Sequence, residues 1–236
     1  MARKEQQRQM YELEGATTAQ RVLRAVSAGT WIAVAWWLLL GPGQAVRTSW
    51  VRAPAAAGNL LRRPCIWASF AICYLRTLVT GFVFLRRGVS WSEAATVAAW
   101  LLFIVMLISI RGGTKPARPG WLDLVGVILF LAGSWINTYS EYQRHKWKGR
   151  PENLGKLYTE GLFRYCRHPN YFGDLLLFSG ICITSGSWFA AIVPALMLAG
   201  FVSVNIPLLD AHRRERYGSE CEKYASQTRK LIPFIW

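Results

Sequence analysis

YTEGLFRYCRHPNYFGD, residues Tyr158–Asp174, is the stretch around which the rest of the chain is organised. It gathers cations, an imidazole, an amide, phenols and carboxylates, and a long uncharged segment follows it directly. Pro169 disfavours the helical conformation at the residue before it and suits the first position of a new helix. We therefore expect a helix to begin at Pro169 and to hold His168, Asn170 and Tyr171 at its N-terminus.

Positive charge gathers at this expected helix N-terminus. Its free N–H groups and dipole favour anions, and Arg164 and Arg167 stand immediately before it. An anionic cofactor such as a nucleotide would suit the place. The residues alone are equally consistent with a positively charged loop whose proline merely starts a helix, and both interpretations stay open here.

The composition is that of a polytopic membrane protein. Apolar residues make up 53% of the chain and charged residues 17%, and the charges fall in blocks between long apolar runs. The net charge of +15 arises from Lys and Arg beside those runs, where anionic lipid headgroups attract them. We therefore expect a lipid bilayer and no nucleic acid as partner. Because the five cysteines show no CxxC spacing, we expect no metal site.

The apolar runs predict an all-α bundle of about six transmembrane helices with a cytosolic C-terminal helix. A segment of 30 uncharged residues is long for one span and contains Ser185-Gly186-Ser187, so we expect a helical hairpin that turns there. Gly41-Pro42-Gly43 is expected to kink or end the first span. The expected spans, the hairpin and the polar helix are, in order, Ala28–Val46, Cys65–Leu85, Glu93–Ile110, Trp121–Tyr139, Leu175–Val204 and Asp210–Lys230.

The distribution of Lys and Arg predicts the orientation. With both termini in the cytosol and six spans, 20 of these residues fall on the cytosolic side and 7 on the other, as the positive-inside rule requires. We expect a cytosolic N-terminal arm over residues 1–26, a four-helix membrane region over 27–139 that forms a lipid pocket, and a C-terminal domain with the cofactor site over 140–236. An integral protein of the endoplasmic reticulum is the expectation if the host is eukaryotic.

Two further polar blocks share the cytosolic face. Arg144 and Lys148 are i,i+4 neighbours, so they could bind one phosphate together, or they could be cations at a membrane boundary. Asp210 follows an apolar span, where a carboxylate is expected to be paired. Tyr217 and Tyr224 are seven residues apart and should share one helix face, either to flank a ring or to lie at the headgroup boundary.

Arg76 is expected near the middle of the second span. An ionisable group at that depth is costly, so it should face the bundle interior and have a partner. Glu93, Asp123, Asp174 and a bound anion are the candidates. A structural ion pair and a role in substrate binding are both open.

Residues 141–174 and 210–236 together resemble the C-terminal domain of membrane steroid 5α-reductases and sterol C14/C7 reductases, in particular a short 5α-reductase-like branch. The resemblance rests on Gln143 with Lys148, on GLFRY followed by RHPNYFGD, on the hairpin and on the Tyr-Gly…Tyr…IPF ending. Isoprenylcysteine carboxyl methyltransferases and phospholipid methyltransferases are similar in the same region. The reductase branch is favoured by Asn170 and Asp174.

The resemblance implies a cytosol-facing NADPH site and reduction of a C=C bond in a sterol, steroid or other lipid that enters from the bilayer. It implies phosphate contacts from Arg144 and Lys148 and positive charge from Arg167. Tyr171 is the expected proton donor, and Arg76 belongs to the substrate region. The remaining cofactor contacts are expected from His168, Asn170, Tyr171, Asp174, Asp210, Tyr217 and Tyr224. The alternatives are an S-adenosylmethionine-dependent lipid or prenylcysteine methyltransferase and a non-enzymatic membrane scaffold.

Overall fold

The computed structural model describes residues 18–51, 61–85, 88–114 and 118–236, and over these residues every regular element is a helix and no strand occurs. The all-α expectation is therefore confirmed. The elements are α2 (Thr18–Leu39), α3 (Gln44–Val51), α4 (Arg62–Val79), η1 (Thr80–Phe84), α5 (Trp91–Arg111), α6 (Trp121–Lys148), η2 (Pro151–Asn153), η3 (Gly161–Arg164), α7 (Pro169–Ser185), η4 (Trp188–Ala191), α8 (Ile192–Gly200), η5 (Phe201–Asn205) and α9 (Ile206–Gln227).

Within the described residues, five helical segments are long and apolar enough to cross a membrane. They are α2, α4 with η1, α5, α6 and the continuous helical run from Trp188 to Gln227. Helix α7 has 17 residues, which is at the short end of the range for a span. Together they agree with the expected polytopic bundle.

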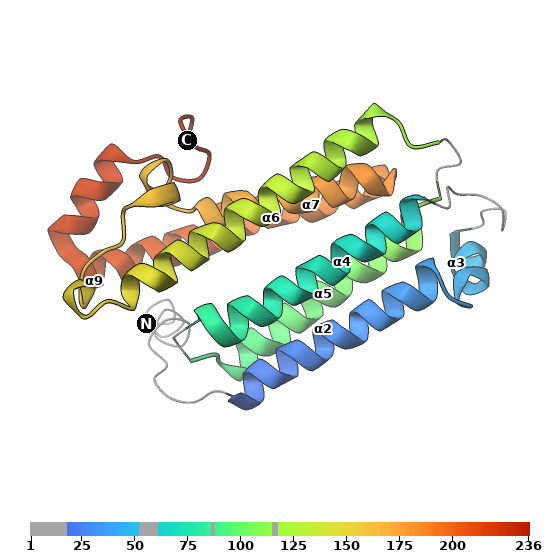
Figure 1. The fold of residues 1–236 in the computed structure, drawn as a ribbon, viewed down its shortest axis with the longest axis horizontal. Helices are drawn as coiled ribbons and strands as arrows, with labels where there is room; N and C mark the ends of the chain where they lie inside the picture. The colour runs from blue at the N-terminus through green and yellow to red at the C-terminus, as the bar shows by residue number, and fades with distance from the viewer. Residues whose placement is uncertain (1–17, 52–60, 86–87, 115–117) are drawn as a thin grey trace.

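The helices form two neighbouring groups (Figure 1). Helices α6 and α7 run side by side, α2, α4 and α5 lie next to each other, and α9 is at the end where α6 finishes. One apolar core joins the groups, with buried side chains such as Leu39 of α2, Phe70 of α4, Ile104 of α5, Phe130 of α6 and Leu177 of α7. This arrangement brings the polar ends of α6, α7 and α9 together.

Glycines let α6 and α7 approach backbone to backbone. A Cβ atom on Gly133 would lie 2.4 Å from the carbonyl oxygen of Gly173, and one on Gly180 would lie 2.4 Å from that of Gly126. Small residues at helix interfaces allow such close packing in membranes. Each helix carries its two glycines seven residues apart, so both contacts fall along one seam.

The expected hairpin is present. Helix α7 ends at Ser185, and Gly186 adopts a left-handed conformation with φ of 68°, which a glycine accepts at little cost. The returning arm runs through η4, α8 and η5 directly into α9. The polar helix therefore starts at Ile206, earlier than expected, and it is broken at Gly218, where φ is 50° and ψ is −126°.

The first span differs from the prediction at both ends. Helix α2 begins at Thr18, so residues 18–26 of the expected arm are helical, and residues 1–17 of that arm lie outside the described part. The helix stops at Leu39, before the Gly41-Pro42-Gly43 sequence, and α3 follows as a separate helix. The expected boundary at Val46 was therefore wrong, and of the two effects expected of Gly41-Pro42-Gly43 the structure shows the second, an end to the helix.

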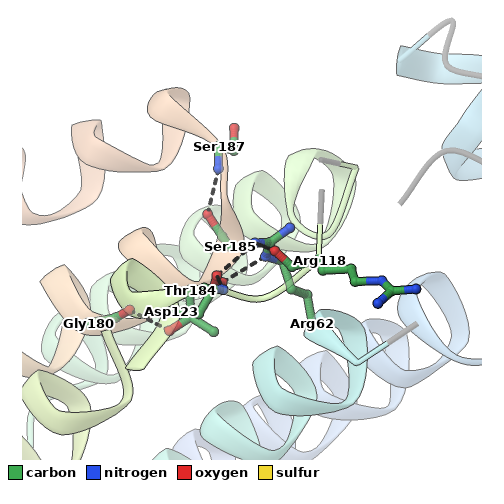
Figure 2. A network of polar contacts seen from close by, with 8 residues as sticks. Arg62, Arg118, Asp123, Gly180, Thr184, Ser185 and Ser187 are labelled. Atoms are coloured by element: carbon green, nitrogen blue, oxygen red, sulfur yellow. Dashed lines mark hydrogen bonds and ion pairs between the residues drawn. The ribbon is translucent and has the colours of Figure 1, made fainter. Parts of the chain in front are cut away.

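A polar network ties the helix ends opposite α9 (Figure 2). Arg62 at the start of α4 donates through Nε and Nη2 to both carboxylate oxygens of Asp123 on α6, at 2.7 Å each. Such bidentate pairing is strong and directional. The backbone N–H of Gly113 donates to the carbonyl of Ser185 at 2.9 Å, which joins α5 to the α7 turn. Asp123 therefore pairs with Arg62, and the proposal that it neutralises Arg76 was wrong.

Candidate functional site

His168 occupies the junction between the η3 loop and α7. It has φ of −131° and ψ of 57°, and α7 starts at Pro169, as the sequence predicts. The side chain is fully buried, and its Nε2 lies 3.1 Å from Oδ1 of Asp210 on α9. The other carboxylate oxygen lies 3.6 Å from Nη2 of Arg167, and Arg213 donates to the Arg167 carbonyl at 3.2 Å. Residues from two distant segments thus form one polar cluster.

The imidazole of His168 is neutral at physiological pH in this cluster. Burial lowers the pKa of His168 to about 4, and although the Asp210 carboxylate opposes this, Arg213 and Arg167 act in the same direction as burial. An ionised carboxylate only accepts hydrogen bonds, so Nε2 carries the proton. Nδ1 is left as a buried acceptor with no hydrogen-bond partner in the described part of the chain. It could accept a hydrogen bond from a ligand.

Tyr171 lies in the first turn of α7, between two rings. Its ring stacks on His168 with centroids 5.4 Å apart, and on Phe201 of η5 with centroids 4.5 Å apart. The π-helical turn η5 brings Phe201 to this place, and such turns are frequent at functional sites. The stack fixes the plane of the Tyr171 ring.

A second polar network lies deeper in the bundle. Arg76 of α4 donates through Nε to the hydroxyl of Thr138 at 2.9 Å, and its Nη2 lies 3.6 Å from Oδ1 of Asp174. Asn137 of α6 donates to the same Asp174 oxygen at 2.9 Å and to the carbonyl of Asn170 at 3.0 Å. Arg76 therefore faces the interior with a partner, as expected, and among its candidate partners that partner is Asp174.

A small apolar cavity lies between α2, α4, α5 and α7, with a volume of about 30 Å³. Cys73 and Thr77, which stand on either side of Arg76 along α4, both line it, as do Tyr74 and Trp31. The Trp31 indole N–H is buried and makes no hydrogen bond within the described residues. This space holds only one or two water molecules, so a lipid would enter it only if the surrounding helices moved apart. The cavity therefore adjoins the Arg76–Asp174 network.

Arg144 and Lys148 lie on one face of α6 but contact different groups. Arg144 donates to Glu141 at 2.6 Å, and it is also close enough to the Tyr171 and Tyr217 phenols to interact with them electrostatically. Lys148 donates to the hydroxyl of Tyr217 at 2.9 Å, and its Nζ lies 5.0 Å from the centre of that ring. Joint binding of one phosphate by the two cations stays a prediction.

Tyr224 is buried beneath the η3 loop. Its hydroxyl donates to the carbonyl of Phe163 at 2.6 Å, and its ring packs with Leu157 and Cys221, against which Tyr217 also packs. The break at Gly218 separates the two tyrosines, so the argument from a continuous helix face does not apply. Tyr217 is near the cations of α6, whereas the observed contact of Tyr224 supports the loop.

Three residues that hold the site together were given no site role in the sequence prediction. Asn137 bridges α6 to α7, and Glu141 is paired with Arg144. Gln143, noted only as part of the family pattern, accepts from the backbone of Leu162 at 3.1 Å. The available signal was the presence of Asn137, Glu141 and Gln143 in a largely apolar helix. Buried polar groups require partners, so these three side chains were expected to make contacts.

Comparisons with known proteins agree with the resemblance. The sequence pattern of the family described as "Protein of unknown function (DUF1295)" matches residues 88–230. The chain is 30% identical to 3-oxo-5-alpha-steroid 4-dehydrogenase 1 of Rattus norvegicus over 193 residues, which are 77% of this chain and 71% of that protein.

Other relatives match over shorter regions. The chain is 30% identical to 3-oxo-5-alpha-steroid 4-dehydrogenase 2 of Sus scrofa over 112 residues, 48% of the chain and 42% of that protein. It is 28% identical to a probable protein-S-isoprenylcysteine O-methyltransferase of Oryza sativa subsp. indica over 120 residues, 49% of the chain and 63% of that protein. The chain thus spans less than two thirds of these two relatives, and proteins named as reductases and as methyltransferases both match it.

Proposed function

We propose that this chain, which belongs to the DUF1295 family of steroid 5α-reductase-like membrane proteins, is an NADPH-dependent reductase. Its substrate would be a sterol, steroid or other lipid with a polarised C=C bond. The observation that carries the proposal is the Arg76–Asp174–Asn137–Asn170 network, which lies beside the apolar cavity that Cys73 and Thr77 line. That network links α4, whose apolar surroundings a lipid substrate would contact, to the α7 N-terminus, where the polar residues suited to a cofactor gather.

The charges at the site suit a ligand that carries phosphates. The carboxylate of Asp210 is in contact with His168 and Arg167, and Glu141 is paired with Arg144, so the nearby acids are already compensated by the protein. The guanidinium of Arg144 has five N–H donors, and only Nη2 is engaged by Glu141. Bidentate binding of phosphate is the interaction that arginine makes best. We therefore assign Arg144, Lys148 and Arg167 to the phosphate groups.

The remaining residues would orient the reacting partners. We assign the buried Nδ1 of His168, Asn170 and the carboxylates of Asp174 and Asp210 to amide and ribose groups, and the rings of Tyr217 and Tyr224 to the pocket wall. Bound NADPH supplies the hydride for one carbon of the C=C bond. Tyr171, its ring held between His168 and Phe201, is assigned the proton for the other carbon. The proposed orientation puts this end of the bundle in the cytosol, in the endoplasmic reticulum of a eukaryotic host.

A methyltransferase is the second candidate, because a relative so named covers about half of the chain. S-adenosylmethionine carries a sulfonium cation, which the excess of cations around α6 and α7 does not favour. Asp210 is already compensated by His168 and Arg167, so it is poorly placed to offset that charge.

Thermal unfolding of the purified protein in detergent distinguishes these functions. A ligand that binds only the folded state raises the unfolding temperature. We expect NADPH to raise it and S-adenosylmethionine to leave it unchanged. The reverse result would overturn the reductase proposal, and indifference to both ligands would favour a scaffold.

Variants locate the site in the same assay. Asn170→Ala and Tyr171→Phe should remove the NADPH shift while the ligand-free protein still unfolds cooperatively. Tyr142→Phe is the matched control, since Tyr142 is an exposed phenol on α6 that stacks outside the site, and it should keep the full shift. Unchanged shifts in both site variants would mean that the cofactor binds elsewhere. Screening enone lipids with NADPH by mass spectrometry would then identify the substrate.

A further inference from the structure

Exposed apolar side chains gather where the end of the described chain meets the η3 loop. Phe234 and Ile235 are 75% and 74% exposed, and Trp236 and Tyr165 are also exposed. The Tyr165 and Phe234 rings contact each other, with centroids 5.5 Å apart. We call these four residues the apolar tip. Water would meet these side chains if nothing covered them, and exposed apolar patches of this kind mark interaction sites.

Hydrogen bonds within the loop of residues 231–236 fix the conformation of the apolar tip. The backbone N–H groups of Leu231 and Ile232 donate to the Trp236 carbonyl at 2.7 Å and 2.6 Å, and Trp236 donates back to Ile232. Leu231 is completely buried and anchors the loop. Phe234 has φ of 67°, a left-handed conformation that is unfavourable for a residue with a side chain. The loop thus directs Phe234 and Ile235 outward at an energetic cost instead of folding them inward.

The surroundings of the apolar tip are cationic. The two segments that form it, residues 161–173 and 223–236, contain no Asp or Glu. Lys230 lies over the Trp236 ring, with Nζ 4.8 Å from its centre. Aromatic residues beside Lys and Arg are typical of segments that lie in the headgroup region of a bilayer with anionic lipids. The cations of the two segments that reach the surface are Arg164, Lys223, Arg229 and Lys230, whereas Arg167 is buried beside Asp210.

The position of the loop agrees with a lipid partner. In Figure 1 the end of the chain lies beside α6 and α7 and further toward the middle of the bundle than α9 does. It is therefore at the level of the spans, not beyond their ends. By contrast, Leu154 is 75% exposed but follows the C-terminal end of α6 through η2.

We infer that the apolar tip inserts into the interfacial region of the membrane leaflet at the site end of the bundle. The partner is an anionic lipid surface. The contact also connects to the site, because the carbonyl of Arg229 accepts a hydrogen bond from the backbone N–H of Arg167 at 2.8 Å, next to His168. Insertion would thus hold the His168 loop at a constant depth beside the bilayer. The inference depends on the membrane location of the chain and not on the reductase proposal.

Photocrosslinking of the full chain in lipid nanodiscs tests this. The photoreactive residue p-benzoylphenylalanine replaces Phe234, and the same residue replaces Leu154 as the control, because both side chains are equally exposed. After illumination in phosphatidylcholine with phosphatidylglycerol, mass spectrometry should find lipid adducts at position 234 and only background at 154. The adducts at 234 should decrease in pure phosphatidylcholine, because the cationic surroundings lose their anionic partner.

Equal lipid labelling at both positions would overturn the inference, since the photoreactive residue would then partition into the bilayer wherever it is placed. Adducts from position 234 to a second copy of the chain, or the absence of lipid adducts at that position, would overturn it as well. Thermal unfolding in detergent checks that the labelled chains are folded. If the chain labelled at 234 is not, the probe is placed at Ile235, which is equally exposed, and the same outcomes apply.

Discussion

Acidification should destabilise the protein through His168. The pKa of this buried imidazole is about 4 in the folded protein and about 6.5 in an accessible chain. Between these values the unfolded chain binds a proton that the folded protein does not, so stability is complete above pH 6.5 and falls as the pH decreases toward 4. From pH 7.5 to pH 5 the expected loss is about 2 kcal/mol, which for a chain of this size lowers the unfolding temperature by roughly 4–8 °C.

The assay is thermal unfolding in a pH-stable detergent at half-unit steps from pH 7.5 to pH 5. His168→Gln keeps a donor for Asp210 but does not titrate, so its unfolding temperature should depend less on pH by about the stated amount. Thr184→Val is the control, because it removes a buried hydrogen bond to Gly180 in the opposite half of α7 and adds no titrating group. It should lower stability at every pH and keep the wild-type slope. If His168→Gln also keeps that slope, His168 is not the group responsible and the reasoning from its burial is refuted.

Two further substitutions test the packing of the bundle. Gly173→Ala puts a Cβ atom 2.7 Å from the Gly133 carbonyl oxygen and should lower the free energy of unfolding by about 1–3 kcal/mol. Gly81→Ala, with open space around it, should be close to neutral in the same unfolding titration in detergent. Equal effects of the two substitutions would contradict close packing of α6 against α7. Arg62→Met removes the buried guanidinium from the Asp123 carboxylate, which is 14% exposed, and should lower the free energy of unfolding by up to about 3 kcal/mol. The double variant with Asp123→Leu should recover most of that loss, and a double variant as unstable as the single one would show that the charge was not the cause.

Local chemistry explains which parts of the fold the sequence predicted. Proline at position 169 excludes a helical residue before it and starts α7, and Gly186 ends that helix, so both boundaries follow from backbone sterics. The long apolar runs predicted the membrane helices for a different reason, because their length and hydropathy suit a bilayer. The start of α2 was missed, since polar residues at a helix end carry no hydropathy signal.

The Tyr158–Asp174 stretch therefore predicted a polar site next to the membrane, but the tertiary structure decided which residues form that site. Nothing in the local sequence distinguishes Asp174 from Asp123 as the partner of Arg76, because the choice depends on which helix faces meet. The seam of glycines sets the distance between α6 and α7, and this brings Asn137 to Asn170 and Asp174. The contact of His168 with Asp210 joins residues 42 positions apart along the chain. Such long-range pairings depend on packing between helices, which local residue preferences do not encode.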